Sequence, residues 1–543
     1  MPNGVLQVPA PRNEPVLDYA PGSSERAGLE ARLDRMLGEQ VEIPVLIGGR
    51  EVHTGRTQEV VCPHDHGHVL GTCHQAGAAE VEAAVAASQQ AWPEWSAMPF
   101  EERAAIFLRA AELLAGSWRS TVNAATMLNQ SKTCYQAEID SACELIDFLR
   151  FNVAFAEELY GQQPVSSPGI WNYVEYRALE GFVFAVTPFN FTAIAGNLPT
   201  SAAIMGNTVL WKPASTALLS SYYVMKLLEE AGLPPGVINL VPGPGATVGD
   251  PVLASRHLAG IHFTGSTPVF QRMWRTIGDR IQDYLTYPRI VGETGGKDFV
   301  FAHPSADVAA LSTALIRGSF EYQGQKCSAA SRAYIPASLW GEVRERLCDE
   351  LATVKMGSPV DFSNFMAAVI DRSSWSNISG YIAEASGGSS YEVVSGGGCD
   401  DSVGYFVEPT VVRSDDPRSR LMSEEIFGPV LTVYIYEDGE LDEALELCDT
   451  TSPYALTGAV FARDRLAVAS IGARLRHAAG NFYINDKPTG AVVGQQPFGG
   501  SRASGTNDKA GSSLNLLRWV STRTTKENFS PPRDYRYPHM DAE

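Results

Sequence analysis

The 543-residue sequence is short of basic residues and has no long apolar run. Lys and Arg together number 42 against 62 for Asp and Glu, which gives a formal net charge of −20. This excess repels nucleic-acid phosphates and anionic lipid surfaces, and no run of Lys and Arg offers a basic patch. No stretch reaches the roughly 18 consecutive apolar residues that a membrane-spanning helix needs. We therefore expect a protein that binds neither nucleic acid nor membranes.

The N-terminal segment lacks the features of a targeting signal. It has no basic start followed by an apolar core, and it carries Glu14 and Asp18, whereas mitochondrial transit peptides are poor in acidic residues. The eight cysteines form no C-x-x-C pair, and a chain of this length needs no disulfides to hold a core. These features favour reduced thiols and a bacterial cytoplasmic protein. A mitochondrial matrix protein whose presequence has been removed is the alternative.

Several motifs of enzyme chemistry are missing. Without a G-x-S-x-G elbow, a Ser/His/Asp hydrolase is not expected. The glycines of VPGPGATVGD do not match G-x-G-x-x-G, so we interpret that segment as a generic turn. Cysteine and histidine cluster in CPHDHGHVLGTCH, from Cys62 to His74, but their spacing is unlike that of paired zinc ligands. We expect a polar turn there and no metal site.

Short apolar runs alternate with helical patterns after Ala178. The expected strands are Phe182–Val186, Val209–Trp211, Ile238–Val241 and Ile261–Phe263, and the expected helices are Thr192–Met205, Thr216–Gly232 and one from near Thr267. This alternation predicts a parallel α/β sheet of the nucleotide-binding kind. A second α/β pattern is expected from about Arg289 to Asn481.

Other segments lie outside these two patterns. An N-terminal arm is expected to contain one amphipathic piece near Ser24–Gly38, and a long helix runs from about Gln136 to Tyr160. Trp171–Leu179 and part of Leu514–Thr524 alternate like exposed strands that fit neither sheet. Such strands pair either with a partner subunit or with each other in one subunit, and the sequence favours neither.

Cys327 is the cysteine in the most unusual surroundings. Most cysteines of a reduced protein are small apolar fillers, and Cys143, Cys348 and Cys448 lie in helical patterns that suit this role. Cys327 instead lies in the polar segment FEYQGQKCSAASR, beside Lys326. A flexible loop keeps a thiol accessible, and a nearby cation lowers its pKa. We therefore expect Cys327 to be a candidate nucleophile with a lowered pKa.

Two further residues could assist this nucleophile. Glu293 follows an apolar segment and precedes Gly295 and Gly296, which let backbone approach a ligand closely. A carboxylate near a thiol suits a general base that activates water against a thioester. Asn190 follows the expected strand Phe182–Val186, where its amide N–H could donate to an oxyanion. A solvated surface Glu and a turn-forming Asn are the ordinary alternatives.

The segment HFTGST, from His262 to Thr267, is a candidate phosphate site. A strand leads to Gly265, and Ser266 then opens a helix whose first backbone N–H groups attract phosphate. Lys212 follows another expected strand, from which it could reach a ribose hydroxyl. Surface lysines are common, so Lys212 alone is weak support.

Seven short motifs occur in a fixed order over most of the chain: PFNFT, LWKP, FTGS, ETGGK, GQKCSA, EEIFGPV and PFGG. Together they resemble the aldehyde dehydrogenase superfamily. The segments AEIDSACELIDFLRFN, EYQGQKCSA, DDSVGYFVEP and NDKPTGAVVGQQPFGGSRASGTNDK are similar to the group within it that acts on L-glutamate γ-semialdehyde. The resemblance runs from about Asn13 to Trp519.

The resemblance implies an α/β protein of aldehyde dehydrogenase-like fold. Its parts would be a Rossmann-type NAD-binding domain, an α/β catalytic domain and a small β element for oligomerisation, into which the two unassigned strands fall. We expect an N-terminal arm at 1–40, the NAD-binding domain at 41–165 and 181–288, the bridging element at 166–180 and 506–543, and the catalytic domain at 289–505. The expected assembly is a homodimer or a higher homo-oligomer.

The implied activity is NAD-dependent oxidation of L-glutamate γ-semialdehyde, which arises from Δ1-pyrroline-5-carboxylate, to L-glutamate in proline catabolism. Cys327 would form a thiohemiacetal whose oxyanion lies between the Asn190 side chain and the Cys327 backbone N–H. Hydride transfer to NAD would leave a thioester, which water activated by Glu293 would hydrolyse. The alternatives are a non-catalytic protein of this fold, a cofactor-independent thiol hydrolase and a broad-range aldehyde dehydrogenase.

The resemblance also implies binding residues. Those for the cofactor are Thr187, Pro188, Phe189, Lys212, Ser215, Gly265, Ser266, Glu425 and Phe427. Many family members carry Glu at the position of Ser215, so some use of NADP stays open although NAD is expected. Those for the substrate are Glu144, Phe191, Ser328, Gly490, Ala491 and Phe498. Gly490 and Ala491 would bind the α-carboxylate on an anchor loop, and Glu144 would lie near the α-amino group. Alternatively, Glu144 belongs to a solvated acidic face with Asp140 and Asp147.

Overall fold

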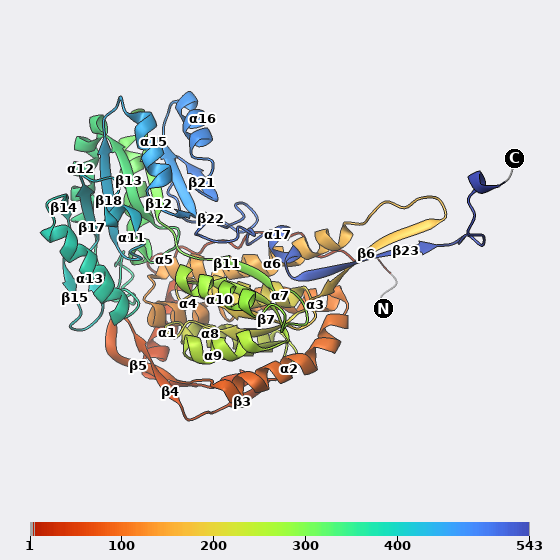
Figure 1. The fold of residues 1–543 in the computed structure, drawn as a ribbon. Coiled ribbons are helices and arrows are strands. Elements are labelled where there is room, and N and C mark those ends of the chain that lie inside the picture. Colours follow the sequence, from red (N-terminus) through yellow and green to blue (C-terminus); the bar gives the residue numbers. More distant parts are fainter. Residues whose placement is uncertain (1–3, 5, 542–543) are drawn as a thin grey trace.

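The computed structural model describes residues 4 and 6–541, which form two lobes and a projecting ribbon (Figure 1). Each lobe is built around a seven-stranded sheet, and the ribbon is a two-stranded sheet that extends away from both. Within the described part of the chain, no helix combines the length and apolar character of a membrane span.

The first lobe contains the predicted parallel sheet. Its strand order is β11-β10-β7-β8-β9-β2-β3, parallel from β11 to β9 and antiparallel beyond. The strands are β2 (Val45–Ile47), β3 (Arg50–Val52), β7 (Phe182–Val186), β8 (Thr208–Lys212), β9 (Ile238–Leu240), β10 (Leu258–Thr264) and β11 (Arg289–Glu293). The sequence assigned Arg289–Glu293 to the second α/β unit, but it is an edge strand of this first sheet.

Helices cover both faces of the first sheet, so successive residues of its strands are buried on opposite sides. Phe182 and Phe184 of β7 pack in one cluster, and Val183 and Ala185 pack in another. The helices of this lobe are α2 (Ala78–Ala97), α3 (Phe100–Ala115), α4 (Arg119–Gln130), α6 (Glu144–Gly161), α7 (Thr192–Ile204), α8 (Leu218–Glu230), α9 (Gly245–Ala254) and α10 (Thr267–Asp279). The long helix expected from Gln136 is divided into α5 (Cys134–Ala137), a π-helix (Glu138–Cys143) and α6.

The second lobe has strand order β14-β17-β18-β13-β12-β20-β21, parallel except for β14. The strands are β12 (Asp298–Ala302), β13 (Ala330–Pro336), β14 (Tyr391–Ser395), β17 (Thr410–Ser414), β18 (Val430–Tyr436), β20 (Thr457–Phe461) and β21 (Asn481–Ile484). The helices are α11 (Val308–Phe320), α12 (Ala337–Leu351), α13 (Arg372–Gly387), α14 (Arg420–Ser423), α15 (Leu441–Thr450) and α16 (Arg465–Arg474). Residues 485–500, between β21 and β22 (Ser501–Arg502), form the anchor loop.

Shorter elements connect and flank the lobes. An extended arm (residues 6–22) leads to α1 (Ser24–Gly38), and β1 (Val41–Ile43), β4 (Thr57–Cys62) and β5 (Asp65–His74) form a three-stranded sheet. Two short two-stranded antiparallel sheets complete the fold: β15 (Cys399–Asp400) with β16 (Phe406–Val407), and β19 (Tyr454–Ala455) with β22.

The ribbon pairs the two strands that the sequence left unassigned. β6 (Ile170–Ala178) and β23 (Val520–Asn528) are antiparallel and stay in register from Val520 opposite Ala178 to Asn528 opposite Ile170. The start of the expected C-terminal strand is instead helix α17 (Ser513–Leu517). The two strands therefore pair with each other within one subunit. The division of the chain into an arm, two domains and a bridging element stays a prediction.

We predict that Gly181→Ala destabilises the first lobe. Gly181 has φ +136°, and an added Cβ would lie 2.2 Å from the His257 carbonyl oxygen, which accepts the Phe182 N–H at the start of β7. A backbone clash of this kind costs about 1–3 kcal/mol, which thermal unfolding would detect. Gly278→Ala is the matched control, because no atom lies within 4 Å of an added Cβ there. Equal unfolding temperatures for the two variants would contradict the prediction.

Candidate functional site

Two cavities meet at Cys327. Cavity I lies beside α6, the anchor loop and the end of β11, and cavity II lies over the carboxyl ends of β7, β8 and β10. Cys327, Phe263 and Thr264 line both cavities. A molecule in either cavity can therefore reach the same thiol.

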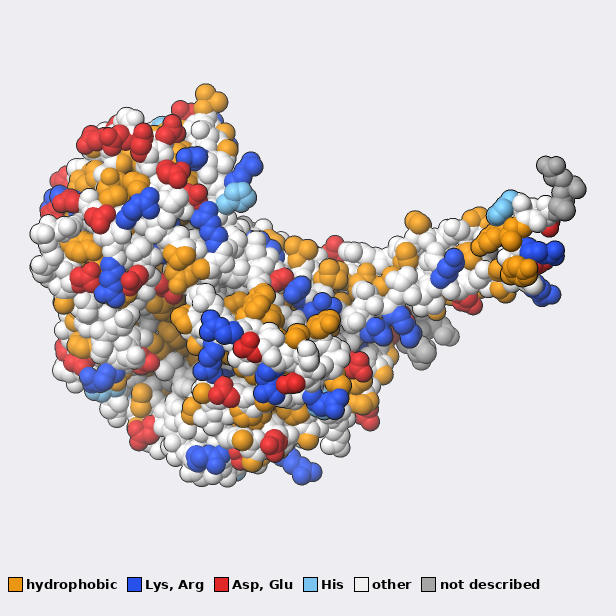
Figure 2. Space-filling model, in the orientation of Figure 1, with side chains coloured by type: hydrophobic (Ala, Val, Ile, Leu, Met, Phe, Trp, Pro, Cys, Tyr) orange, Lys and Arg blue, Asp and Glu red, His pale blue; other side chains and the backbone are white. Residues whose placement is uncertain are grey.

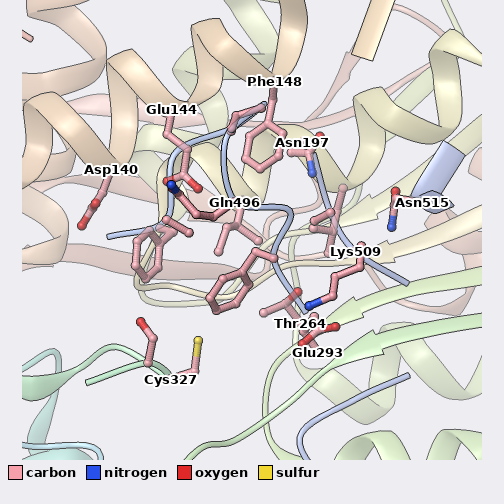
Figure 3. Close-up of a pocket in the computed structure, with 18 of the residues that line it drawn as sticks. Asp140, Glu144, Phe148, Asn197, Thr264, Glu293, Cys327, Gln496, Lys509 and Asn515 are labelled. Carbon is pink, nitrogen blue, oxygen red and sulfur yellow. The ribbon is translucent and has the colours of Figure 1, made fainter. Parts of the chain in front are cut away.

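Cavity I gathers residues from distant parts of the sequence. Figure 3 shows Glu144 entering it from the side opposite Cys327 and Glu293. The predicted residues that line it are Glu144, Phe191, Glu293, Cys327, Ser328, Gly490, Ala491 and Phe498. The structure thus brings the expected nucleophile, the expected base and every expected substrate contact to one cavity.

Cavity II gathers almost all the expected cofactor contacts. The predicted residues that line it are Thr187, Pro188, Phe189, Asn190, Lys212, Gly265, Ser266, Glu425 and Phe427. Ser215 is the exception: it is exposed outside the lining, and its carbonyl accepts a hydrogen bond from Gln58. Ala214 lines the cavity in its place.

A strained turn presents Cys327. Tyr322 and Gln323 both adopt the left-handed region, with φ of 52° and 56°, which costs about 1–3 kcal/mol for each non-glycine residue. Gly324 follows at φ +64°, where an added Cβ would lie 2.2 Å from the Gly428 carbonyl oxygen. The Gln323 amide offsets the strain by donating to the carbonyls of Ser131 and Ala368.

Asn190 lies beside this turn. It follows β7 and is buried, and its Nδ2 donates to the Gln325 carbonyl at 2.9 Å. This bond fixes the amide and uses one of its two N–H groups. The other N–H can donate to an oxyanion formed at Cys327, as an oxyanion hole requires.

The expectation of a lowered thiol pKa at Cys327 is wrong for this structure. Burial raises the pKa of Cys327 well above its ordinary value, and the carboxylates of Asp298, Glu425 and Glu293 raise it further. The Lys326 ammonium does not compensate, because it donates to the Gln136 side chain and lies 3.4 Å from Asp140. The resting thiol is therefore protonated and needs a base.

Glu293 is suited to be that base. It ends β11, and its Oε2 accepts the Gly500 N–H at 2.9 Å. Burial raises the pKa of Glu293 to about 8, although the Gly500 N–H and the Lys509 ammonium lower it. A carboxyl with this pKa can exchange protons near neutral pH. At Gly295 and Gly296 an added Cβ would meet the Glu425 carboxylate and the Cys327 carbonyl oxygen, so both glycines allow close packing within the protein, and Gly295 also lines cavity II.

Lys509 is a functional candidate that the sequence analysis missed. Its Nζ donates to the carbonyls of Gly480 and Gly499 and to Asn481 Oδ1, and its side chain lines cavity I near Glu293 (Figure 3). Lys509 ends the segment GTNDK, but its distance in sequence from Glu293 gives no indication that the two side chains are close. Only the return of the chain after the anchor loop brings the two residues together.

A buried ionic cluster lies behind Glu144. Lys132 and Lys326 both pair with Asp140, and the Lys132 ammonium lies over the Phe191 ring at 4.4 Å. Asp140 is therefore an internal ion-pair partner and not part of a solvated acidic face. Burial raises the pKa of Glu144 well above its ordinary value, with Asp140 adding to the rise. A cation entering cavity I would favour the ionised form of Glu144.

Cavity II has the features of a dinucleotide site. Lys212 is buried, with its ammonium 3.1 Å from the Pro213 carbonyl, and Glu425 accepts the Gly296 N–H at 2.8 Å on another part of the lining. Helices α9 and α10 both begin at this cavity, where their first N–H groups attract phosphate. The segment VPGPGATVGD is not the expected generic turn, because its second half forms the start of α9, where Gly245 and Gly249 line the cavity.

Among the described residues, one further group brings metal-ligating side chains together. Ligand atoms of Glu42, His53 and His74 all lie within 4.8 Å of one another. However, His74 Nδ1 accepts the Gly55 N–H at 3.2 Å, so its Nε2 carries the proton and donates to Glu42 at 2.8 Å. A metal at Nε2 would break this arrangement. The expectation that the protein has no metal site stays a prediction.

We predict that Lys509→Met raises the pKa of Glu293 above about 8, because the substitution removes a cation that favours the carboxylate. The carbonyl stretch of protonated Glu293 can be followed against pH by infrared difference spectroscopy, with Glu293→Gln as the blank. Lys487→Met is the control, since its ammonium pairs with Glu321. A pKa that Lys509→Met leaves unchanged would show that Lys509 does not act on the carboxyl.

Comparisons with known proteins agree with this geometry. A sequence model of the aldehyde dehydrogenase family matches residues 51–525. Delta-1-pyrroline-5-carboxylate dehydrogenase, mitochondrial, from Dictyostelium discoideum is 54% identical and aligns over 98% of this chain and 96% of its own length. The Bos taurus protein of the same name is 51% identical, over 97% and 94%.

A solved structure extends the similarity to the whole fold. The crystal structure of the Delta-pyrroline-5-carboxylate dehydrogenase from Mycobacterium tuberculosis bound with NAD has a TM-score of 0.96 and 56% identity. The match covers 99% of this chain and 100% of that chain, so it includes both lobes and the ribbon. The chain therefore belongs to the aldehyde dehydrogenase family.

Proposed function

We propose that this enzyme oxidises L-glutamate γ-semialdehyde to L-glutamate with NAD, in proline catabolism. The semialdehyde forms when water opens the ring of Δ1-pyrroline-5-carboxylate. The relatives described above take their name from this ring compound. The main support for this proposal is cavity I, which has the Cys327 thiol at one end and Glu144 with the anchor loop at the other. An aldehyde with an amino acid head group complements both ends.

Oxidation begins with attack of the Cys327 sulfur on the aldehyde carbon. The thiol gives up its proton as the C–S bond forms, and Glu293 can accept a proton near neutral pH. The free N–H of Asn190 stabilises the oxyanion of the adduct. When bound, NAD accepts the hydride of the former aldehyde carbon, and a thioester is left on Cys327.

Hydrolysis of the thioester completes the reaction. After Glu293 has released the thiol proton to solvent, it takes a proton from water, and the resulting hydroxide equivalent attacks the thioester carbon. The C–S bond then breaks, and the Cys327 sulfur takes the proton from Glu293 as L-glutamate is released. The Gly500 N–H holds the Glu293 carboxylate during this step. Overall, one water and one NAD are consumed for each aldehyde oxidised.

The head group determines which aldehyde is accepted. Glu144 would pair with the α-ammonium group, and Gly490, Ala491 and Ser328 would bind the α-carboxylate. Phe191 and Phe498 would enclose the aliphatic chain between them. A simple aldehyde such as propanal has no group for either polar end.

NAD would occupy cavity II. Lys212 and Glu425 would bind ribose hydroxyls, and the start of α10 at Ser266 would bind the pyrophosphate. Phe427 and Phe189, whose rings lie 5.8 Å apart, would border the nicotinamide, with Thr187, Pro188 and Gly265 along the cleft. Exposed Ser215 would lie outside the direct contacts, so discrimination against NADP should be weak.

Location and assembly are part of the proposal. The eight cysteines are all free, which suits a reducing compartment, and we favour the bacterial cytoplasm over the mitochondrial matrix for which the Dictyostelium and Bos taurus relatives are labelled. The ribbon would make a homodimer or a higher homo-oligomer. Exposed Trp171 and Phe529 lie on it, and Figure 2 shows hydrophobic side chains gathered toward its tip.

NADH absorbance tests the proposed function. With Δ1-pyrroline-5-carboxylate as the substrate, the purified enzyme should reduce NAD with a kcat/KM at least about a hundredfold above that for propanal. Propanal lacks two charged groups, and the loss of two such contacts would lower kcat/KM by about this factor. A parallel assay with NADP measures cofactor preference. Faster turnover of propanal would refute the substrate assignment, and no turnover of either aldehyde would refute the activity.

Cys327→Ala should bind NAD but form no NADH, because the alanine offers no sulfur for the covalent step. NAD binding can be measured by calorimetry and NADH by absorbance. Cys399→Ala is the control, because that cysteine is also half-buried but lies in hairpin β15–β16. Substantial NADH formation by Cys327→Ala would overturn the nucleophile assignment.

Trp171→Asp combined with Phe529→Asp should shift the enzyme toward monomers, since two charges would then lie in an interface that apolar side chains form. Light scattering measures the mass in solution. Tyr287→Asp is the control, because Tyr287 is 81% exposed but is not part of the ribbon. If the double variant keeps the mass of the unaltered enzyme, the ribbon does not mediate assembly.

A further inference from the structure

The extended N-terminal arm follows the helix that presents Glu144. The Val8 N–H donates to Glu157 near the end of α6, and the Leu17 N–H donates to Glu138 in the preceding π-helix, both at 2.9 Å. Between these points the arm passes the anchor loop, which is more than 450 residues away in sequence. The arm thus contacts both the helix that carries Glu144 and the loop that carries Gly490 and Ala491.

Asn13 joins α6 to the anchor loop. Its Nδ2 donates to Asp147 Oδ2 and to the Val493 carbonyl oxygen, both at 2.8 Å. Its Oδ1 accepts a hydrogen bond from Gln495 Nε2 at 3.0 Å. A carboxylate and a backbone carbonyl can only accept, so the amide can point in one direction only.

Gly494, between these two loop contacts, packs directly on α6. It has φ +80°, and an added Cβ would lie 2.2 Å from a ring carbon of Phe151. The neighbouring Val493 is buried and lines cavity I. Gly494 therefore packs on the Phe151 ring with no room for a side chain, and Asn13 bonds to the residues on both sides of that contact.

Glu14 fixes the arm at the same point. Its N–H donates to Asp147 Oδ1 at 2.7 Å, and its carboxylate pairs with Arg119 at 2.6 Å and Arg150 at 2.7 Å. The arm is therefore anchored through backbone and side chain beside Asn13. Because the arm is fixed at Glu14, the neighbouring Asn13 can hold α6 and the anchor loop at a set distance from each other.

We propose that Asn13 is a positioning residue for recognition of the substrate head group. It holds the anchor loop, with Gly490 and Ala491, at a fixed distance from the helix that carries Glu144. A semialdehyde with an α-ammonium and an α-carboxylate needs both ends in place at once, whereas a simple aldehyde needs neither. This inference rests on the proposed function.

Asn13→Asp tests the proposal with almost no change in side-chain volume. The substitution replaces two donors by an oxygen that faces the Asp147 carboxylate and the Val493 carbonyl. We expect the KM for glutamate γ-semialdehyde to rise about tenfold, with kcat/KM for propanal and the KM for NAD changed less than twofold. Arg12→Ala, an exposed neighbour on the arm, should match the unaltered enzyme. Equal losses for both aldehydes would overturn the proposal.

A double-mutant cycle tests the bond to the loop. Gln495 is exposed, so Gln495→Ala should fold normally. If Gln495 acts through Asn13, adding Gln495→Ala to Asn13→Ala should leave the KM for glutamate γ-semialdehyde unchanged from that of Asn13→Ala alone. Independent, additive effects would show that Asn13 does not act through this contact.

Hydrogen exchange separates failure of this inference from failure of the proposed function. In the enzyme without substrate, Asn13→Asp should accelerate amide exchange in residues 486–497 several-fold, while β12 stays unchanged. If the unaltered enzyme does not oxidise glutamate γ-semialdehyde, the proposed function fails, and exchange still decides whether Asn13 holds the loop. If that enzyme is active and Asn13→Asp changes neither exchange nor KM, the positioning role is refuted.

Discussion

The low polarity of the protein around Cys327 is the constraint on which the site depends. Burial raises the pKa values of Cys327, Glu293 and Glu425 together, so the resting thiol is protonated and the two carboxyl groups exchange protons near neutral pH. Glu293 has a pKa of about 8, and its ionised form can accept the proton of the Cys327 thiol and so activate the nucleophile. The same low polarity strengthens each hydrogen bond to an oxyanion.

The fold supplies this environment because its reactive groups follow strand ends. Asn190 follows β7, Lys212 ends β8 and Glu293 ends β11, so all three lie at the carboxyl ends of the parallel strands. The second lobe adds Cys327 on a strained turn before β13. The two cavities then approach the thiol from different sides, which keeps the aldehyde and the dinucleotide apart except where they react.

Local sequence patterns predicted most of the first sheet, and the predicted site residues, except Ser215, line the two cavities at Cys327. Apolar runs marked β7 and β10 because buried parallel strands are apolar on both faces. The apolar runs could not place β11 in that sheet, because strand pairing depends on contacts between residues that are far apart in sequence. The polar context of Cys327 suggested a lowered pKa, yet the direction of the Lys326 side chain depends on Asp140, far away in sequence. Lys509 and Asn13 gave no local signal, since each acts on a residue that only folding brings near.

Mass spectrometry of Glu293→Gln tests the central claim most directly, that oxidation passes through a thioester on Cys327. Mixed with NAD and Δ1-pyrroline-5-carboxylate, this variant should form about one NADH per active site and then stop, because hydrolysis lacks its base. This single turnover should be slower than in the unaltered enzyme, because the Cys327 thiol must then lose its proton to solvent. A peptide containing Cys327 should gain the mass of glutamate less water. Continuous NADH formation with Cys327 unmodified would contradict the account.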